Sequence, residues 1–242
     1  HITGIKDILY GTGVLFIGYE GFGLVTNAAG NMINPQKNLP KALYLSVFIV
    51  IAIYIAVSIT VLGNLSISEI NAASDYALAE AAKPFLGSFG FTLIAIAALF
   101  STGSAINATL FGGANICYMI ARDGELPQIA TDRVWHNATG GLLITAFLVI
   151  SFIVFFDLAG VAMMGSGAFL LIYAAVNAGH LRIAKQTGAN RVILLFSLLL
   201  CLGMFIILEI YTFQQAPSAV YTMILLLVGS FASEKIYTRF FK

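Results

Sequence analysis

The segment Leu15–Gly23, LFIGYEGFG, combines three glycines and one carboxylate within a long apolar run. Glycine weakens a helix, and membrane proteins use broken helices to present free backbone groups to ligands and ions near the middle of the bilayer. We therefore predict that the first apolar segment is unwound around Ile17–Tyr19. Close helix packing through small residues is the competing interpretation of the glycines, but it does not account for Glu20.

Glu20 is the side chain in this segment that could do chemistry. An ionisable group at membrane depth is costly and indicates function. It could carry a proton, hold a cation or form a hydrogen bond between helices, and a purely structural acid remains the alternative. Because desolvation disfavours the charged form, we predict that Glu20 is largely protonated near neutral pH.

Two further segments carry polar side chains within apolar runs. The first, Ser101–Asn115, reads STGSAINATLFGGAN, and its best candidates for lining a binding pocket are Asn107 and Thr109. The second is GSG at residues 165–167, where Ser166 is expected to face a cavity or gate. The alternative is that such hydroxyls bond to their own helix while small residues allow tight packing. No metal site is expected, because histidines, cysteines and carboxylates lack coordinating spacing.

Composition indicates that lipid is the solvent of this chain. The 242 residues are 60% hydrophobic and only 10% charged, whereas soluble domains are about 25% charged. The mean hydropathy is +0.94. A net charge of +1 gives no basis for nucleic-acid binding. An enzyme would need clustered catalytic groups at depth, and Glu20 is the one deep acid we expect.

A spanning helix needs about 20 mostly apolar residues, and seven such segments predict an all-α polytopic membrane protein. The predicted spans are 8–30 (broken), 42–63, 90–120, 138–156, 158–181, 192–213 and 219–237.

The basic residues give these spans an orientation. Ten of the 12 lysines and arginines fall on one side of a seven-span arrangement, and the exceptions are Lys6 and Lys83. Since basic residues stay cytoplasmic, we predict an extracellular N-terminal end and a cytoplasmic C-terminus. Glu209 is expected near the outer end of its span, as a structural or rim acid.

The longest extracellular loop, residues 64–89, is predicted to be helical. Ser66–Glu69 is a capping-box pattern that opens one short helix. Asp75–Lys83 predicts a second, which Pro84 would stop. A lid over the outer face and a plain connector are both open interpretations.

Two ordered motifs now identify a family resemblance. Phe16–Leu43 resembles the sixth transmembrane helix and following loop of permeases in the amino acid–polyamine–organocation (APC) superfamily. The matching residues are Phe16, Gly18, Tyr19 and Glu20, followed by Asn34, Pro35, Leu39 and Pro40. Ile120–Pro127, IARDGELP, is similar to the loop after the family's eighth helix and contributes Arg122, Asp123 and Gly124.

The resemblance implies a secondary active transporter that moves amino acids by alternating access, with a LeuT-like fold of two inverted repeats. This chain would carry helices six to twelve: the second repeat, with its first helix broken, and two extra helices. Its partners would be the bilayer, an amino acid and the missing N-terminal half of the same protein. It would use no cofactor beyond a coupling ion, H+ or Na+.

The resemblance also assigns roles within the site. The backbone of Phe16, Ile17 and Gly18 would bind the substrate's α-amino group, and Tyr19 would line the pocket or pack. Val14 and Thr109 match positions that are aromatic in an arginine-exchanging member, which favours a small or mid-sized zwitterion here. Proton-coupled symport or exchange is the leading expectation. Sodium coupling, a polyamine or cationic substrate, and a channel-type subunit are the alternatives.

Overall fold

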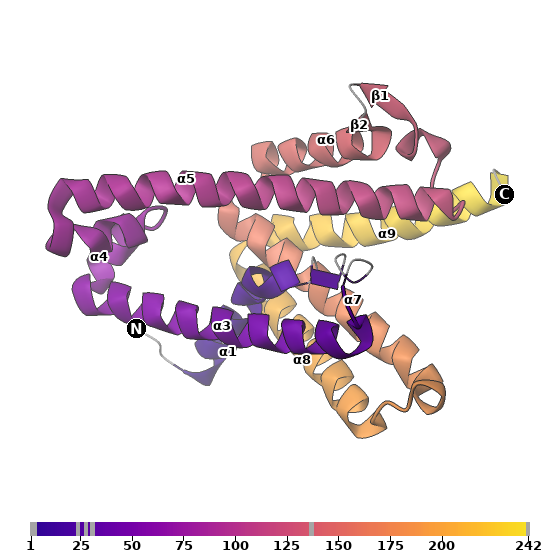
Figure 1. Ribbon diagram of the computed structural model, residues 1–242, viewed down its shortest axis with the longest axis horizontal. Helices are drawn as coiled ribbons and strands as arrows, with labels where there is room; N and C mark the ends of the chain where they lie inside the picture. The colour runs from indigo at the N-terminus through magenta and orange to yellow at the C-terminus, as the bar shows by residue number, and fades with distance from the viewer. Residues whose placement is uncertain (1–3, 23–24, 27–28, 30–31, 136–137, 241–242) are drawn as a thin grey trace. The chain divides into compact units, whose positions relative to one another are not determined.

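The computed structural model describes residues 4–22, 25–26, 29, 32–135 and 138–240, and these are almost wholly helical (Figure 1). In chain order the elements are α1 (Ile5–Leu15), the 3₁₀ helix η1 (Phe16–Phe22), α3 (Pro35–Asn64), α4 (Ile67–Ala72), α5 (Ala77–Arg122), the 3₁₀ helix η3 (Gln128–Ala130), β1 (Arg133–Trp135), β2 (Ala138–Thr139), α6 (Gly140–Phe155), α7 (Leu158–Thr187), α8 (Arg191–Gln215) and α9 (Pro217–Phe240). The predicted all-α class is confirmed. The sequence did not indicate the short antiparallel hairpin of β1 and β2.

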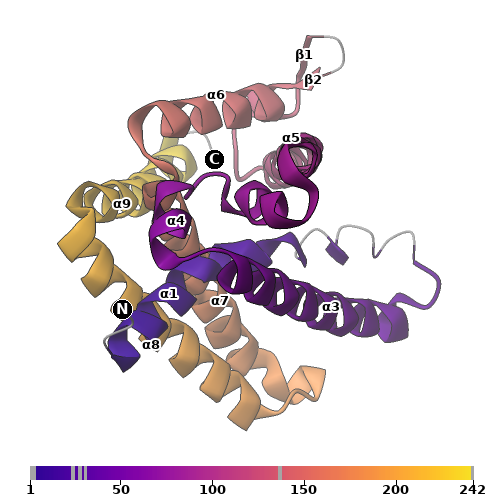
Figure 2. The same ribbon diagram turned by 90° about the vertical axis from the view of Figure 1, so that its left-hand side faces the viewer.

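The described chain forms two compact units, His1–Glu20 with Met119–Lys242, and Gly21–Tyr118. In the first unit α7 packs along α8, while α1 and α9 each pack against both of these helices. Figure 2 shows α1, α7 and α8 close together. The core of this unit includes Met163, Leu170, Leu208 and Met223. This packing holds the end of α1 against α7.

The second unit consists mainly of the long helices α3 and α5, joined through α4 (Figure 1). None of the residues of α3 is buried, although its most apolar window has a mean hydropathy of 2.8. Water would not tolerate so extended an apolar surface. The surface of α3 therefore fits a lipid environment.

Five helices in the described part of the chain are long and apolar enough to cross a membrane, namely α3, α5, α7, α8 and α9. The apolar helix α6 is shorter, at 16 residues, and the first predicted span corresponds to α1 followed by η1. These bounds make the chain a multi-pass membrane protein. The predicted count of seven spans stays a prediction.

The loop between α3 and the long part of α5 contains the predicted capping box. The backbone N–H of Ser66 donates to the Glu69 carboxylate at 2.7 Å, and the Glu69 N–H donates to the Ser66 hydroxyl at 3.3 Å. The prediction that Pro84 ends the next helix is wrong, because Pro84 lies inside α5. The helical conformation is interrupted instead at Gly87, which has a φ of 58° and a ψ of −149°. Proline costs only one backbone hydrogen bond, whereas this conformation needs glycine.

Candidate functional site

The α-helix is interrupted where the sequence predicts it. The backbone there is not unwound but coiled more tightly, as a 3₁₀ helix. The α-helix ends at Leu15, and the backbone N–H of Phe16 already bonds to the carbonyl of Gly13, three residues back. Phe16–Phe22 then forms a 3₁₀ helix of seven residues. Runs of this length are uncommon, and they mark strain or a hinge. The backbone thus departs from regular α-helix throughout Phe16–Phe22.

One serine on α7 bonds to both sides of the break. The Ser166 hydroxyl donates to the Val14 carbonyl at 2.9 Å and accepts the Ile17 N–H at 3.0 Å. Its side chain is fully buried, at 0% exposure. We expected Ser166 to face a cavity or gate, whereas the structure places its oxygen against the break. The hydroxyl satisfies a donor and an acceptor that the change of helix type leaves without their usual partners.

The two glycines beside Ser166 allow close packing in two directions. A Cβ added at Gly165 would lie 2.7 Å from Ile17 Cδ1, in the 3₁₀ helix. A Cβ added at Gly167 would lie 2.6 Å from Glu209 Oε1 on α8 and 3.0 Å from Met223 Sδ on α9. The GSG turn therefore holds the break on one side and contacts α8 and α9 on the other.

Glu20, in η1, lies beside an aromatic side chain of α7. The Tyr173 hydroxyl donates to Glu20 Oε2 at 3.5 Å, a long hydrogen bond, while Glu20 Oε1 is buried and has no partner in the described structure. The Tyr173 ring meets Phe16 edge-on, with centroids 6.1 Å apart, and stacks on Phe169 at 6.5 Å. The carboxyl group is thus shielded from solvent and has one weak donor.

The other predicted site residues are distributed between the two units. Gly18 is exposed and Tyr19 is half-buried in η1. Asn107 and Thr109 are exposed on α5, in the part of the chain that forms the second unit. The structure thus brings Phe16–Glu20 together with Ser166. Substrate binding by any of these residues stays a prediction.

The loop motifs have a local structural role. Pro35 occupies the first turn of α3 after Asn34, whose φ is 51°, and Pro40 lies within the same helix. Arg122 ends α5, and Gly124 follows with a φ of 80°. Bonds from Gly124 N–H to the Ala121 carbonyl and from Glu125 N–H to the Ile120 carbonyl, both 3.0 Å, form a Schellman cap. Arg122 and Asp123 are exposed beside this cap.

Sequence reasoning missed a second buried acid. We expected Glu209 to be a structural or rim acid near the outer end of its span, and the structure shows that its Oε2 is buried and has no hydrogen-bond partner among the described residues. Thr212, one turn further along α8, is 2% exposed, and its hydroxyl is likewise unpaired there. The available signal was the i, i+3 spacing of these two polar residues, which places them on one helix face.

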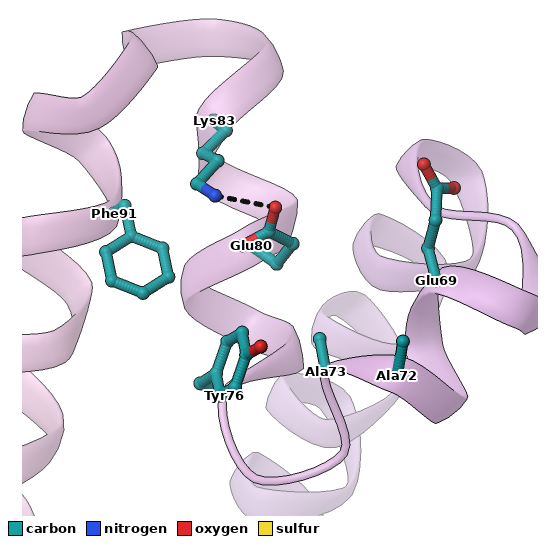
Figure 3. A pocket seen from close by; sticks show the side chains of 7 residues that line it. All are labelled: Glu69, Ala72, Ala73, Tyr76, Glu80, Lys83 and Phe91. Atoms are coloured by element: carbon teal, nitrogen blue, oxygen red, sulfur yellow. Dashed lines mark hydrogen bonds and ion pairs between the residues drawn. The ribbon is translucent and has the colours of Figure 1, made fainter.

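The segment from Glu69 to Phe91 lines a separate cavity of about 360 Å³ within the second unit. Figure 3 shows Lys83 between the Glu80 carboxylate, 2.7 Å from its Nζ, and the Phe91 ring, whose centroid is 4.8 Å away. Tyr76 meets the same ring edge-on. The lysine and both aromatic side chains thus bring the segments before and after Gly87 together. This arrangement suits a lid or a rigid connector equally.

The described residues include no group of three or more histidines, cysteines or carboxylates placed to hold a metal ion. The chemistry that the arrangement around the break supports is different. It pairs a non-α backbone, held by Ser166, with the buried acid Glu20 one turn away. A group of this kind binds small polar or charged ligands within a membrane.

The fold and the site together define a polytopic helical membrane protein with a discontinuous helix. A family model described as amino acid permease matches residues 2–232. The chain therefore belongs to the amino acid permease family, within the APC superfamily.

Individual relatives agree with this assignment. The chain is 40% identical over 237 residues to an uncharacterized protein of Methanocaldococcus jannaschii, covering 98% of this chain and 54% of that protein. It is 33% identical to the inner membrane transport protein YbaT of Escherichia coli over 78% of this chain and 44% of that protein. It is 31% identical to the serine/threonine exchanger SteT of Bacillus subtilis over 51% of this chain and 28% of that protein. The chain thus spans about half the length of the first two relatives.

Proposed function

We propose that this chain is the second half of a secondary active transporter that carries amino acids across the membrane by alternating access. The observation that carries the proposal is the discontinuous first helix, bonded to Ser166 and followed by the buried acid Glu20. Family membership and the transport named for YbaT and SteT support it. The missing first half would complete the substrate site in a LeuT-like fold.

The break supplies the substrate chemistry in this proposal. Backbone carbonyl oxygens attract a cation, and N–H groups attract an anion, so the two ends of a zwitterion suit a discontinuous helix. The substrate's ammonium group binds the carbonyls of Phe16–Gly18, and Tyr19, Asn107 and Thr109 line the pocket. The exchanger relative named for serine and threonine supports a small neutral amino acid.

Glu20 supplies the coupling chemistry. A buried neutral carboxyl can donate one hydrogen bond, and its loss of a proton creates a charge that the surrounding apolar groups disfavour. Glu20 therefore binds a proton in the closed state and releases it when the cavity opens to the cytoplasm. Sodium coupling is the alternative, and the exposed polar helix segment around Asn107 and Thr109 on α5 favours it as a source of oxygen ligands.

Uptake by the full-length permease in proteoliposomes tests this function. We expect labelled serine or a similar neutral amino acid to accumulate when a proton gradient is imposed, and Glu20→Gln to abolish gradient-driven accumulation. Glutamine keeps the size and a donor but cannot ionise. Glu69→Gln is the matched control, because Glu69 is exposed and glutamine also completes a capping box.

The outcome that contradicts the proton role is wild-type accumulation and wild-type pH dependence in Glu20→Gln. Accumulation that follows a sodium gradient instead would favour the alternative coupling ion. Competition by unlabelled serine, leucine and arginine then separates a neutral from a cationic substrate class.

A further inference from the structure

Glu209, the acidic residue in the membrane part of α8, is not among the residues that form or bond to the helix break. Glu209 Oε1 lies 2.6 Å from the position that a Cβ would take on Gly167, so the carboxyl group rests directly on the backbone of α7. Met223 Sδ of α9 lies 3.0 Å from the same position. Glu209 is thus packed between three helices, and its Oε2 is buried with no hydrogen-bond partner in the described structure.

Thr212 adds a second unpaired oxygen on the same face of α8. Threonines in the middle of membrane helices usually bond to the carbonyl four residues back. Thr12, Thr60 and Thr145 do so in this chain, at 2.8–2.9 Å. Thr212 does not, although its side chain is only 2% exposed. A buried hydroxyl without a partner costs free energy, which indicates that a group other than the described residues bonds to it.

The surroundings favour a proton as the missing ligand. Among described residues, α7 has no charged or histidine side chain between Asp157 and His180, α9 has none before Glu234, and α1 has only Lys6 and Asp7. The tyrosines of these helices have other contacts: Tyr10 bonds to Gln215 and stacks on Tyr211, Tyr173 bonds to Glu20, and Tyr221 packs on Phe213. Among the described side chains of these helices, none pairs as a cation with the Glu209 carboxyl group.

We propose that Glu209 and Thr212 form a second proton-binding site of this transporter, separate from Glu20. This inference rests on the proposed transport function. Protonation forms an O–H bond on Glu209 Oε2 with a proton taken from hydronium, and it releases one water molecule. The new O–H donates toward the Thr212 hydroxyl, directly or through one bound water, so that both buried oxygens gain a partner.

The position of the site links it to the break. Glu209 contacts Gly167, and the preceding residue, Ser166, bonds to Val14 and Ile17 across the break. When Glu209 loses its proton, its charge demands solvation and moves the carboxyl group away from α7. That displacement reaches Ser166 through one peptide bond. The charge on Glu209 therefore biases the conformation of the substrate-binding backbone.

Infrared difference spectroscopy on the full-length permease tests the site without a transport assay. We expect a carbonyl band of a protonated carboxyl group that survives in Glu20→Gln and disappears in the Glu20→Gln/Glu209→Gln double variant. Thr212→Val, which removes the hydroxyl at nearly constant shape, should shift the frequency of that band. A band that is unaffected by both changes at α8 would overturn the proposal.

Uptake then measures the linkage. One linked proton changes apparent KM by up to about tenfold per pH unit over the range in which the site titrates. We expect Glu209→Gln to remove one such dependence and Glu209→Asp to keep it, and Thr212→Val to move its midpoint. If the pH dependence of apparent KM is unchanged in Glu209→Gln, Glu209 is not a proton-binding site, whereas proton coupling in the wild type is unaffected by that result. Absence of any proton-linked uptake in the wild type would contradict the proposed function instead.

Discussion

Replacing Ser166 by alanine removes a side chain that bonds to both sides of the break in the first helix. The change deletes a hydroxyl that is fully buried and leaves the Val14 carbonyl and the Ile17 N–H without their partner. Alanine has nearly the same volume, so the loss of two hydrogen bonds dominates the effect. We therefore expect the break itself to lose its fixed geometry.

The magnitude follows from the two bonds. Hydrogen bonds between membrane helices contribute about 0.6 kcal/mol on average and up to about 1.7 kcal/mol each. Ser166→Ala should therefore lower the free energy of unfolding by about 1–3 kcal/mol. It should also raise apparent KM, because the backbone that binds substrate in our proposal is no longer held.

Equilibrium unfolding of the full-length protein in mixed detergent micelles measures the loss. Ser230→Ala is the matched control, since the Ser230 hydroxyl donates only to the Leu226 carbonyl of its own helix, at 2.7 Å. Surface substitutions of that kind usually stay within about 0.5 kcal/mol. If the two alanine variants unfold with the same free energy, the bonds from Ser166 do not stabilise the break.

Three further outcomes follow from other parts of the chain. Gly87→Ala should destabilise by about 1–3 kcal/mol in the same unfolding assay, because alanine must adopt a φ near 58° with no gain in contacts. Ser66→Ala should raise the pKa of Glu69, which NMR titration would detect, since the hydrogen bond from the Ser66 hydroxyl is the largest cause of the lowered pKa in the wild type and alanine removes it. Cysteines at positions 37 and 83, made as Lys37→Cys and Lys83→Cys, should react with impermeant reagents from opposite sides of the membrane.

Gly103→Ala is a control for Gly87→Ala, because it should change the free energy of unfolding in the opposite direction. Gly103 lies inside α5 with open space around its Cα, so Gly103→Ala should stabilise by about 0.5–1 kcal/mol. Equal effects at both positions would contradict the backbone argument. For topology, labelling of both cysteines from one side would refute the proposed orientation.

The lowered pKa of Glu69 also determines the pH range in which this carboxyl group stabilises the folded state. A carboxyl group whose pKa is lowered in the folded state contributes stability above its ordinary pKa, and that contribution disappears as the pH falls through the folded value. The hydrogen bonds from the Ser66 side chain and backbone are the cause, against a small opposing effect of burial. Acidification below the ordinary pKa of a glutamate should therefore loosen α4 in the wild type. A Ser66→Ala variant that retains the wild-type response would argue against this cause.

Local features were predictable from the sequence and tertiary ones were not. The capping box joins Ser66 and Glu69, which lie three positions apart, and the structure confirms it. Glycine density around Glu20 similarly indicated where the α-helix would end. Pro84 misled the prediction because a proline removes only one backbone bond, which a helix can lose without ending.

The partners of the break could not be read from local patterns. Ser166 lies 149 sequence positions from Ile17, to which it bonds, and no periodicity indicates which hydroxyl will make such a contact. The burial of Glu209 Oε2 could not be predicted for the same reason, because helix length indicates the depth of a residue but not the face that its side chain presents. Its spacing from Thr212 held the missing information, since two polar residues on one face of an apolar helix indicate a buried cluster.

The GSG turn of α7 has a consequence for how this protein can vary. Successive residues of a helix point about 100° apart, so a membrane helix normally alternates between constrained positions and positions that accept many side chains. Here three consecutive positions are constrained, each by a different neighbour: Ile17, the backbone of the break, and Glu209. In saturation mutagenesis of α7, positions 165, 166 and 167 should therefore all reject most substitutions. Elsewhere in α7, positions that reject substitutions should recur with the period of the helix.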